Sequence, residues 1–187
     1  MLIDSKNSGL LVIDVQEKLL PAIHDAQRVL ESCLWLVNVA RRLRVPIAAT
    51  EQYPRGLGVT VAALREALGD SPIVEKITFS GASEPAVLAT PAVTRQQVIV
   101  AGTETHVCVL QTVVGLLALN KDVFIVADAV GSRSPQDREL ALARLRHLGV
   151  TVVTREMVAF EWLERAGTGT FREISRDFLR GTGRQPD

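Results

Sequence analysis

Two kinds of apolar pattern alternate along the chain. Short runs in which nearly every residue is apolar are typical of strands buried on both faces, and longer stretches with apolar residues three or four positions apart are typical of helices. We predict strands at 10–15, 47–50, 73–75, 97–101, 123–127 and 150–153. We predict helices at 26–43, 60–68, 105–119, 136–148, 155–164 and 171–179, a helix start at 83–88 and a loop at 52–58.

This alternation predicts the fold class. Strands joined by helices form right-handed crossovers, which give a parallel sheet with helices on both faces. We therefore expect a Rossmann-like α/β protein of three layers, α/β/α, around a six-stranded parallel sheet. A chain of 187 residues suits one domain, which we place at 1–180, followed by a disordered tail at 181–187. In such folds the site lies outside the carboxyl ends of the strands, where the strand order reverses.

Composition and charge narrow the classes of partner. The chain has 21 Lys and Arg against 21 Asp and Glu, so the zero formal net charge does not indicate a nucleic-acid partner. The apolar run 9–15 is too short to span a bilayer and is interrupted by Asp14, so we expect no membrane partner. Two cysteines, Cys33 and Cys108, are too few for a disulfide scaffold, which indicates free thiols and a cytoplasmic protein.

Three polar residues stand where the predicted fold would place a site. Asp14 ends the first strand, Lys76 follows the third strand, and Cys108 lies in the first turn of the helix after the fourth strand. Taken alone, each has a structural explanation, because a cysteine there usually packs, an aspartate usually caps a turn and a lysine is usually solvated. Their occurrence at three strand ends favours a joint chemical role. Cys33, on the apolar face of the first long helix, keeps the packing explanation.

Cys108 has the chemistry of a nucleophile. Only the thiolate attacks, and a helix N-terminus or a nearby ammonium favours that anion, so we expect Lys76 to lower the pKa of Cys108. Asp14 would then orient the ammonium or take the thiol proton as a general base. The turn at 101–105 is placed to present backbone N–H groups to a tetrahedral oxyanion.

Several motifs follow one another in a recognisable order. They are Leu-Val-Ile-Asp-Val-Gln at 11–16, Glu-Lys at 75–76, Gly-Thr-Glu-Thr-His-Val-Cys-Val at 102–109 and Asp-Ala-Val-Gly-Ser-Arg at 128–133. Together they resemble the isochorismatase-like cysteine hydrolases, the superfamily of nicotinamidases, N-carbamoylsarcosine amidases and isochorismatases. Thr-Glu-Gln-Tyr-Pro-Arg-Gly-Leu-Gly at 50–58 and Phe-Arg-Glu-Ile at 171–174 resemble the isochorismatase-domain-containing subgroup.

The resemblance implies a topology and a mechanism. The sheet order would be 3-2-1-4-5-6, and Asp14, Lys76 and Cys108 would form a catalytic triad. A cis peptide between Thr103 and Glu104 would aim the N–H groups of Glu104 and Cys108 at the oxyanion. The thiolate would attack a carbonyl carbon and release an amine or ammonia, and water would then hydrolyse the thioester. The resemblance also implies a homo-oligomer.

The chain departs from the metal-dependent relatives. Nicotinamidases place an Asp and several His residues after the second strand, whereas this chain has Glu51, Gln52 and Tyr53 there. We therefore expect no metal and no cofactor, and we expect His106 to be a pocket or interface residue and not the base. The Glu104 side chain is expected to point to solvent. As substrate-binding residues of a small, neutral, partly apolar carbonyl compound we name Gln16, Gln52, Tyr53 and Phe79.

Other functions compete with a cysteine amidohydrolase. One is a vinyl-ether hydrolase like isochorismatase itself, although true isochorismatases lack the nucleophilic cysteine. Another is a non-catalytic oligomeric binding protein that keeps the site as inherited architecture. A thiol redox enzyme is disfavoured, because Cys108 has no nearby resolving cysteine in the sequence.

Overall fold

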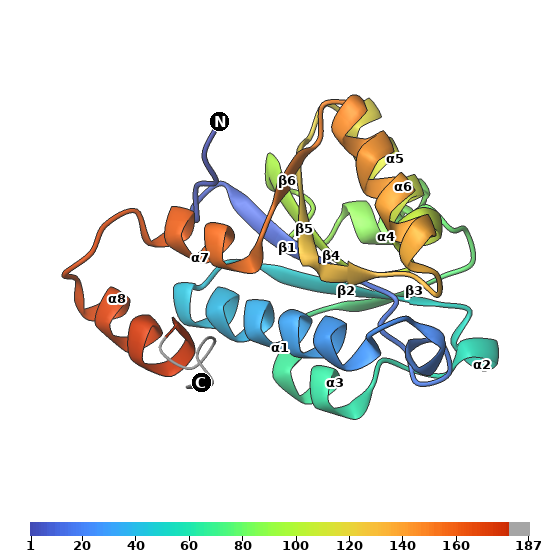
Figure 1. Cartoon of the computed structure of the whole chain (residues 1–187), viewed down its shortest axis with the longest axis horizontal. Coiled ribbons are helices and arrows are strands. Elements are labelled where there is room, and N and C mark those ends of the chain that lie inside the picture. Colours follow the sequence, from blue (N-terminus) through green and yellow to red (C-terminus); the bar gives the residue numbers. More distant parts are fainter. Residues whose placement is uncertain (180–187) are drawn as a thin grey trace.

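The computed structural model describes residues 1–179, so the tail predicted at 181–187 lies outside the described residues. Within them, helices cover both faces of one sheet (Figure 1). The strands are β1 (Ser8–Ile13), β2 (Ile47–Gln52), β3 (Ile73–Lys76), β4 (Gln97–Thr103), β5 (Asp122–Gly131) and β6 (Thr151–Val153). The α-helices are α1 (Ala26–Leu43), α2 (Pro54–Leu57), α3 (Ala62–Leu68), α4 (Pro85–Leu88), α5 (Leu110–Ala118), α6 (Pro135–His147), α7 (Arg155–Leu163) and α8 (Gly169–Ile174).

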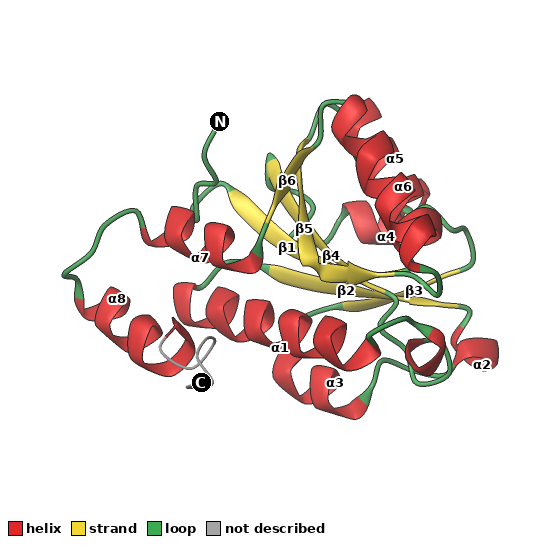
Figure 2. Ribbon diagram, viewed as in Figure 1, coloured by secondary structure: helices red, strands yellow, loops and turns green. Residues whose placement is uncertain are grey.

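The sheet has the predicted topology. Its six described strands are all parallel and run in the order β3-β2-β1-β4-β5-β6, which confirms the expected α/β class and strand order. Helices α1, α3, α7 and α8 lie on one face, and α4, α5 and α6 lie on the other (Figure 2). The order reverses between β1 and β4, so the carboxyl ends of these two strands form the switch point at which such folds bind ligands.

Burial explains the continuous apolar runs. Every residue of β1 is buried, and successive side chains enter opposite layers, because a strand alternates its faces with a period of two. Leu10 and Val12 belong to the core under α1, whereas Leu11 and Ile13 belong to the core under α5 and α6. A strand packed on both faces needs apolar residues at every position, which is the pattern seen in the sequence.

Some local structure differs from the predictions. The helix predicted at 105–119 begins as a π-helical turn, Thr105–Val109, before α5. The loop at 52–58 contains the single turn α2, whose first residue is Pro54, a residue suited to the first helical position. The start predicted at 83–88 divides into a 3-10 turn, Gly81–Ser83, and α4.

Gly102 allows β4 to approach β1 at the switch point. Its φ of +113° lies in the region that favours glycine, and a Cβ placed there would lie 2.1 Å from the carbonyl oxygen of Ile13. A side chain at position 102 would therefore push apart the two strands that carry Asp14 and Cys108. Among the described residues, the structure contains no helix long and apolar enough to cross a membrane.

Candidate active site

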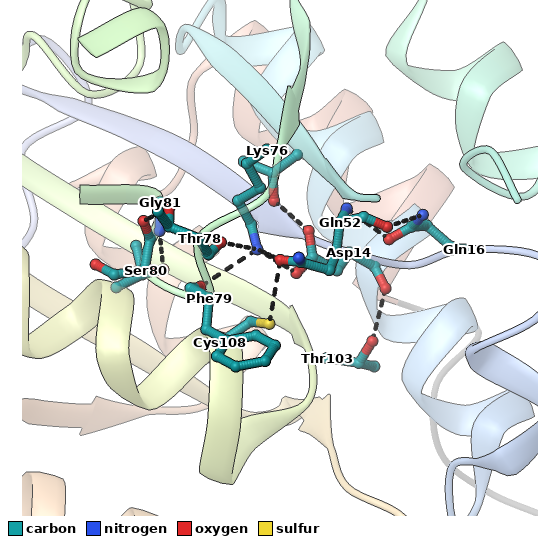
Figure 3. A network of polar contacts seen from close by, with 12 residues as sticks. Asp14, Gln16, Gln52, Lys76, Thr78, Phe79, Ser80, Gly81, Thr103 and Cys108 are labelled. Atoms are coloured by element: carbon teal, nitrogen blue, oxygen red, sulfur yellow. Dashed lines mark hydrogen bonds and ion pairs between the residues drawn. The ribbon is translucent and has the colours of Figure 1, made fainter. Parts of the chain in front are cut away.

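The carboxyl ends of the central strands bring together side chains from distant parts of the sequence. Asp14 follows β1 in a left-handed conformation with φ +49°, and Lys76 is the last residue of β3. Cys108 lies in the π-helical turn that follows β4. Asp14, Lys76 and Cys108 are all buried, at 0%, 2% and 5% exposure. The local fold thus assembles these three side chains within one buried network of polar contacts (Figure 3).

Asp14 and Lys76 form a buried ion pair. The Lys76 Nζ lies 2.8 Å from Asp14 Oδ2, and both side chains are completely buried. The hydroxyl of Thr50, at the neighbouring position on β2, donates to Asp14 Oδ1 at 2.7 Å. A buried charge is costly unless it has a partner of opposite charge and hydrogen bonds. Lys76 and Thr50 together supply these to the Asp14 carboxylate. Sequence reasoning missed Thr50, because only the register of β2 against β1 places its hydroxyl beside Asp14.

Lys76 also contacts three neutral acceptors. Its Nζ donates to Gln52 Oε1 at 2.6 Å and lies 3.3 Å and 3.2 Å from the carbonyl oxygens of Thr78 and Phe79. The ammonium is therefore fixed in position from several sides.

Gln16 supports Gln52 and is itself out of reach of solvent. The Gln16 amide accepts from the backbone N–H of Gln52 at 2.8 Å and donates to the Gln52 carbonyl at 3.0 Å and to the Gly58 carbonyl at 2.6 Å. Both of its amide hydrogens are used, and the residue is 0% exposed. Gln16 therefore contributes to the site by holding Gln52 and the adjoining loop, and not by the direct substrate contact expected from the sequence.

Cys108 is held as a thiol. Its Sγ makes a long contact of 4.0 Å with Gln52 Oε1. Burial and, after it, the nearby Asp14 charge raise the pKa of the Cys108 thiol to about 12, and Lys76 acts in the opposite direction. Lys76 lowers this pKa as expected, but desolvation and the Asp14 carboxylate outweigh the ammonium, so the expected net lowering of the Cys108 pKa is wrong.

Tyr53 and Phe79, the two aromatic residues predicted to bind substrate, contact Lys76 through backbone atoms. Tyr53 donates its backbone N–H to the Lys76 carbonyl at 2.9 Å, and the Phe79 carbonyl faces the Lys76 ammonium. Their side chains are about half exposed, at 51% and 53%. Beside Lys76, the surface forms a pocket of about 350 Å³. It is lined by Pro54, Glu75, Lys76, Ile77 and Glu84.

The turn before Cys108 is tied to its surroundings. The peptide bond between Thr103 and Glu104 is cis, and the Thr103 hydroxyl donates to the Asp14 carbonyl at 2.7 Å. Glu104 is 8% exposed and pairs with Arg133 at 2.8 Å, so the expectation that its side chain points to solvent is wrong. The Arg133 side chain is 62% exposed, so the ion pair lies at the edge of the turn with the carboxylate mostly covered.

His106 lies beside this turn. Its Nδ1 is 3.0 Å from the hydroxyl of the buried Ser132, and its Nε2 is 3.9 Å from the carboxylate of Asp137 on α6. It thus links the π-helical turn that carries Cys108 to Ser132 and to the first turn of α6. Within residues 1–179 no three His, Cys, Asp or Glu side chains gather in a group that could hold a metal ion.

Comparisons with known proteins fit this geometry. Residues 8–157 match the isochorismatase domain. Isochorismatase domain-containing protein 2 of Danio rerio is 39% identical over 175 residues, covering 93% of this chain and 88% of the relative. The secreted isochorismatase effector Isc1 of Phytophthora sojae is 36% identical over 176 residues, covering 91% and 83%.

Solved structures show the same fold over nearly the whole chain. The MAR1 ribonuclease of Caenorhabditis elegans is 35% identical with a TM-score of 0.89, covering 98% of this chain and 95% of that one. YcaC of Pseudomonas aeruginosa, solved with hexane-2,5-diol and covalent acrylamide, is 25% identical with a TM-score of 0.87, covering 95% and 92%. The chain therefore belongs to the isochorismatase family of α/β hydrolases.

Proposed function

We propose that the protein is a cysteine hydrolase that cleaves a C–N bond of the amide type in a small molecule, with Cys108 as nucleophile. The observation that carries the proposal is the thiol beside a buried pair of opposite charges, Asp14 and Lys76, at the switch point of the sheet. In this proposal Asp14 accepts the thiol proton, and Lys76 compensates the negative charge that forms during the attack. No cofactor or metal takes part in this scheme.

The first half of the reaction forms a thioester. The Cys108 proton passes to the Asp14 carboxylate while the sulfur electron pair attacks the carbonyl carbon, and the C=O electron pair moves onto oxygen. In this scheme the N–H groups of Glu104 and Cys108 stabilise that oxyanion, at the turn that follows Thr103. The C–N bond then breaks, and the leaving nitrogen takes the proton from Asp14.

The second half releases the acid. Water gives a proton to Asp14 and attacks the thioester carbonyl, the C–S bond breaks, and the sulfur recovers its proton from Asp14. The products are a carboxylic acid and an amine or ammonia, and the enzyme returns to its starting state. Lys76 stays positively charged throughout. It pairs with Asp14 at rest and compensates the negative charge that passes from Asp14 through the sulfur to the oxyanion, so the buried net charge does not change.

The surroundings of the site favour a small and neutral substrate. Asp14 already neutralises Lys76, and Glu104 already pairs with Arg133. The half-exposed rings of Tyr53 and Phe79 offer apolar contact at the mouth, with Gln52 as a polar contact deeper in the site. The covalent acrylamide in the relative from P. aeruginosa shows that a small amide-bearing electrophile reaches a reactive group in that protein.

The test is an activity screen over small amides, ureas and carbamoyl compounds, with Cys108→Ala as the control. We expect turnover of at least one compound and its complete loss in Cys108→Ala, whose melting temperature should match the wild type. Isochorismate hydrolysis that survives Cys108→Ala would instead identify a vinyl-ether hydrolase. Because one relative is called a ribonuclease, RNA belongs in the screen, and its cleavage would contradict the proposal.

A third outcome would support a binding protein. In that case a folded protein would turn over no compound, and an electrophile would leave Cys108 unlabelled. Labelling of Cys108 before the wholly buried Cys33 is expected if Cys108 is the nucleophile.

We also propose that the protein is a cytoplasmic homo-oligomer. Its two free cysteines and zero net charge support these proposals, because neither disulfides nor charge repulsion opposes them. Light scattering during gel filtration gives the number of subunits. Cell fractionation decides the location, since the relative from P. sojae is named as secreted.

A further inference from the structure

The side-chain amide of Gln52 lies between the nucleophile and the ammonium (Figure 3). Its Oε1 is 2.6 Å from Lys76 Nζ and 4.0 Å from Cys108 Sγ, and its Nε2 donates to the Ile77 carbonyl at 2.7 Å. An ammonium has only hydrogens to offer and a carbonyl only lone pairs. These neighbours therefore fix the amide orientation, with the oxygen toward Lys76 and Cys108 and the nitrogen toward Ile77.

The Lys76 ammonium has more acceptors around it than hydrogens. An ammonium carries three hydrogens. Four acceptors surround it, from Asp14, Gln52, Thr78 and Phe79. A thiolate at Cys108 must compete with them to pair with the ammonium, and the oxygen of one of them, Gln52 Oε1, lies 4.0 Å from the sulfur.

The position of Gln52 is rigidly set. It is 7% exposed and pairs in register with Lys76 between β2 and β3. The Gln16 amide holds both the N–H and the carbonyl of its backbone. Its side chain therefore has little freedom to leave the gap between Cys108 and Lys76.

We propose that Gln52 is a positioning residue that holds the nucleophile at rest: its carbonyl oxygen accepts the hydrogen of the Cys108 thiol and engages the Lys76 hydrogen that a thiolate would need. The negative end of the carbonyl dipole faces the sulfur, so it favours the neutral thiol over the anion. A resting thiol is also protected from chance electrophiles and oxidants, because these react with the thiolate.

Four other charged or titratable groups of the described residues lie around Cys108. Asp14 and Lys76 act on the sulfur from the ends of β1 and β3. On the other side of the π-helical turn, His106 and the Asp137 carboxylate on α6 contact each other. A substitution at Gln52 leaves all of these charged groups in the chain and changes the contact of Lys76 only at the Gln52 oxygen, so the alkylation rate of Cys108 reports on the amide and on the hydrogen it engages.

The inference rests on the proposed role of Cys108 as nucleophile, and its test needs no substrate. The rate of iodoacetamide alkylation is measured for Cys108 and Cys33 separately, by peptide mass spectrometry, between pH 6 and 9. Gln52→Met keeps the length of the side chain and removes the carbonyl, and Gln52→Glu keeps the shape and adds a negative charge. Gln27→Met on the exposed surface of α1 is the matched control.

Opposite changes are expected in the two variants. In Gln52→Met the freed Lys76 hydrogen turns to the sulfur, so alkylation of Cys108 should rise about tenfold at each pH, the effect of one unit of pKa. In Gln52→Glu the added charge should lower the rate by about tenfold or more. Gln27→Met should behave like the wild type.

Some results would overturn the inference. These are an unchanged or lower rate at Cys108 in Gln52→Met, an equal rise at Cys33, which reports a loosened fold, or changes of the same sign in both variants. If Gln52→Met does not fold, Gln52→Glu alone tests the inference. An unchanged or higher alkylation rate of Cys108 in Gln52→Glu would then overturn it. Amide hydrolysis that persists in Cys108→Ala would refute the proposed function while leaving the alkylation result intact.

Discussion

Removing the Lys76 ammonium should destabilise the protein far more than an ordinary lysine substitution. Lys76→Met keeps the unbranched aliphatic stem and deletes the charge that lies 2.8 Å from Asp14 Oδ2. The Asp14 carboxylate stays completely buried, with the Thr50 hydroxyl at 2.7 Å as its remaining close polar partner among the described side chains. One neutral hydrogen bond does not compensate for a buried charge.

The size of the effect follows from the burial of both partners. Breaking a buried pair by removing one partner costs about 3–5 kcal/mol, whereas exposed pairs contribute about 0–1 kcal/mol. Domains have unfolding free energies of about 5–15 kcal/mol in total, so Lys76→Met should lose a large part of the stability. The double variant Asp14→Asn with Lys76→Met has no unpaired charge and should be more stable than Lys76→Met alone.

Urea unfolding with linear extrapolation measures these differences. Lys6→Met, at an exposed site near the N-terminus, is the control and should unfold like the wild type. The reasoning is refuted if Lys76→Met lies within about 1 kcal/mol of the wild type, or if the double variant loses as much as the two single variants together. An activity assay would not test this reasoning, because every mechanism that uses the triad predicts loss of activity in Lys76→Met.

Three further predictions concern the same edge of the sheet. Thr50→Val removes the hydrogen bond to Asp14 and should cost about 1.5–3 kcal/mol in urea unfolding, because the acceptor is charged. Gly102→Ala should cost at least about 3 kcal/mol or prevent folding, since the new methyl group meets the Ile13 carbonyl at 2.1 Å; a stable variant would show that β1 and β4 can separate there. In the wild type, alkylation of Cys108 should rise about tenfold per pH unit from pH 6 to 9, because the pH stays below a thiol pKa of about 12; a plateau near pH 7 would mean that the thiolate already forms at rest.

Much of the fold could be predicted from the apolar pattern. The predicted helix 26–43 coincides with α1, because one apolar face repeats there over several turns. The strands were found because their burial on both faces leaves continuous apolar runs. The single turn α2 and the π-helical turn Thr105–Val109 were not predicted, since four or five residues are too few to show a period.

The site could be predicted in part. Asp14, Lys76 and Cys108 were named because polar residues at the ends of buried strands in a parallel sheet must share one edge. Thr50 and Arg133 were missed, since a threonine ending a strand and an arginine in a loop are common everywhere. Their roles depend on register and on burial of the partner carboxylate, which the order of residues does not show.

The direction of the Cys108 pKa could not have been predicted from residue types. The sequence places one cation and one anion near the thiol, and these act in opposite directions on its proton. Asp14 and Lys76 sit 2.8 Å apart and largely cancel each other, so burial decides the sign. A thiolate formed alone would add a buried negative charge, whereas a proton passed from Cys108 to Asp14 moves the charge without adding one. The nucleophile is therefore made most easily during the reaction itself, by the same proton transfer that starts it.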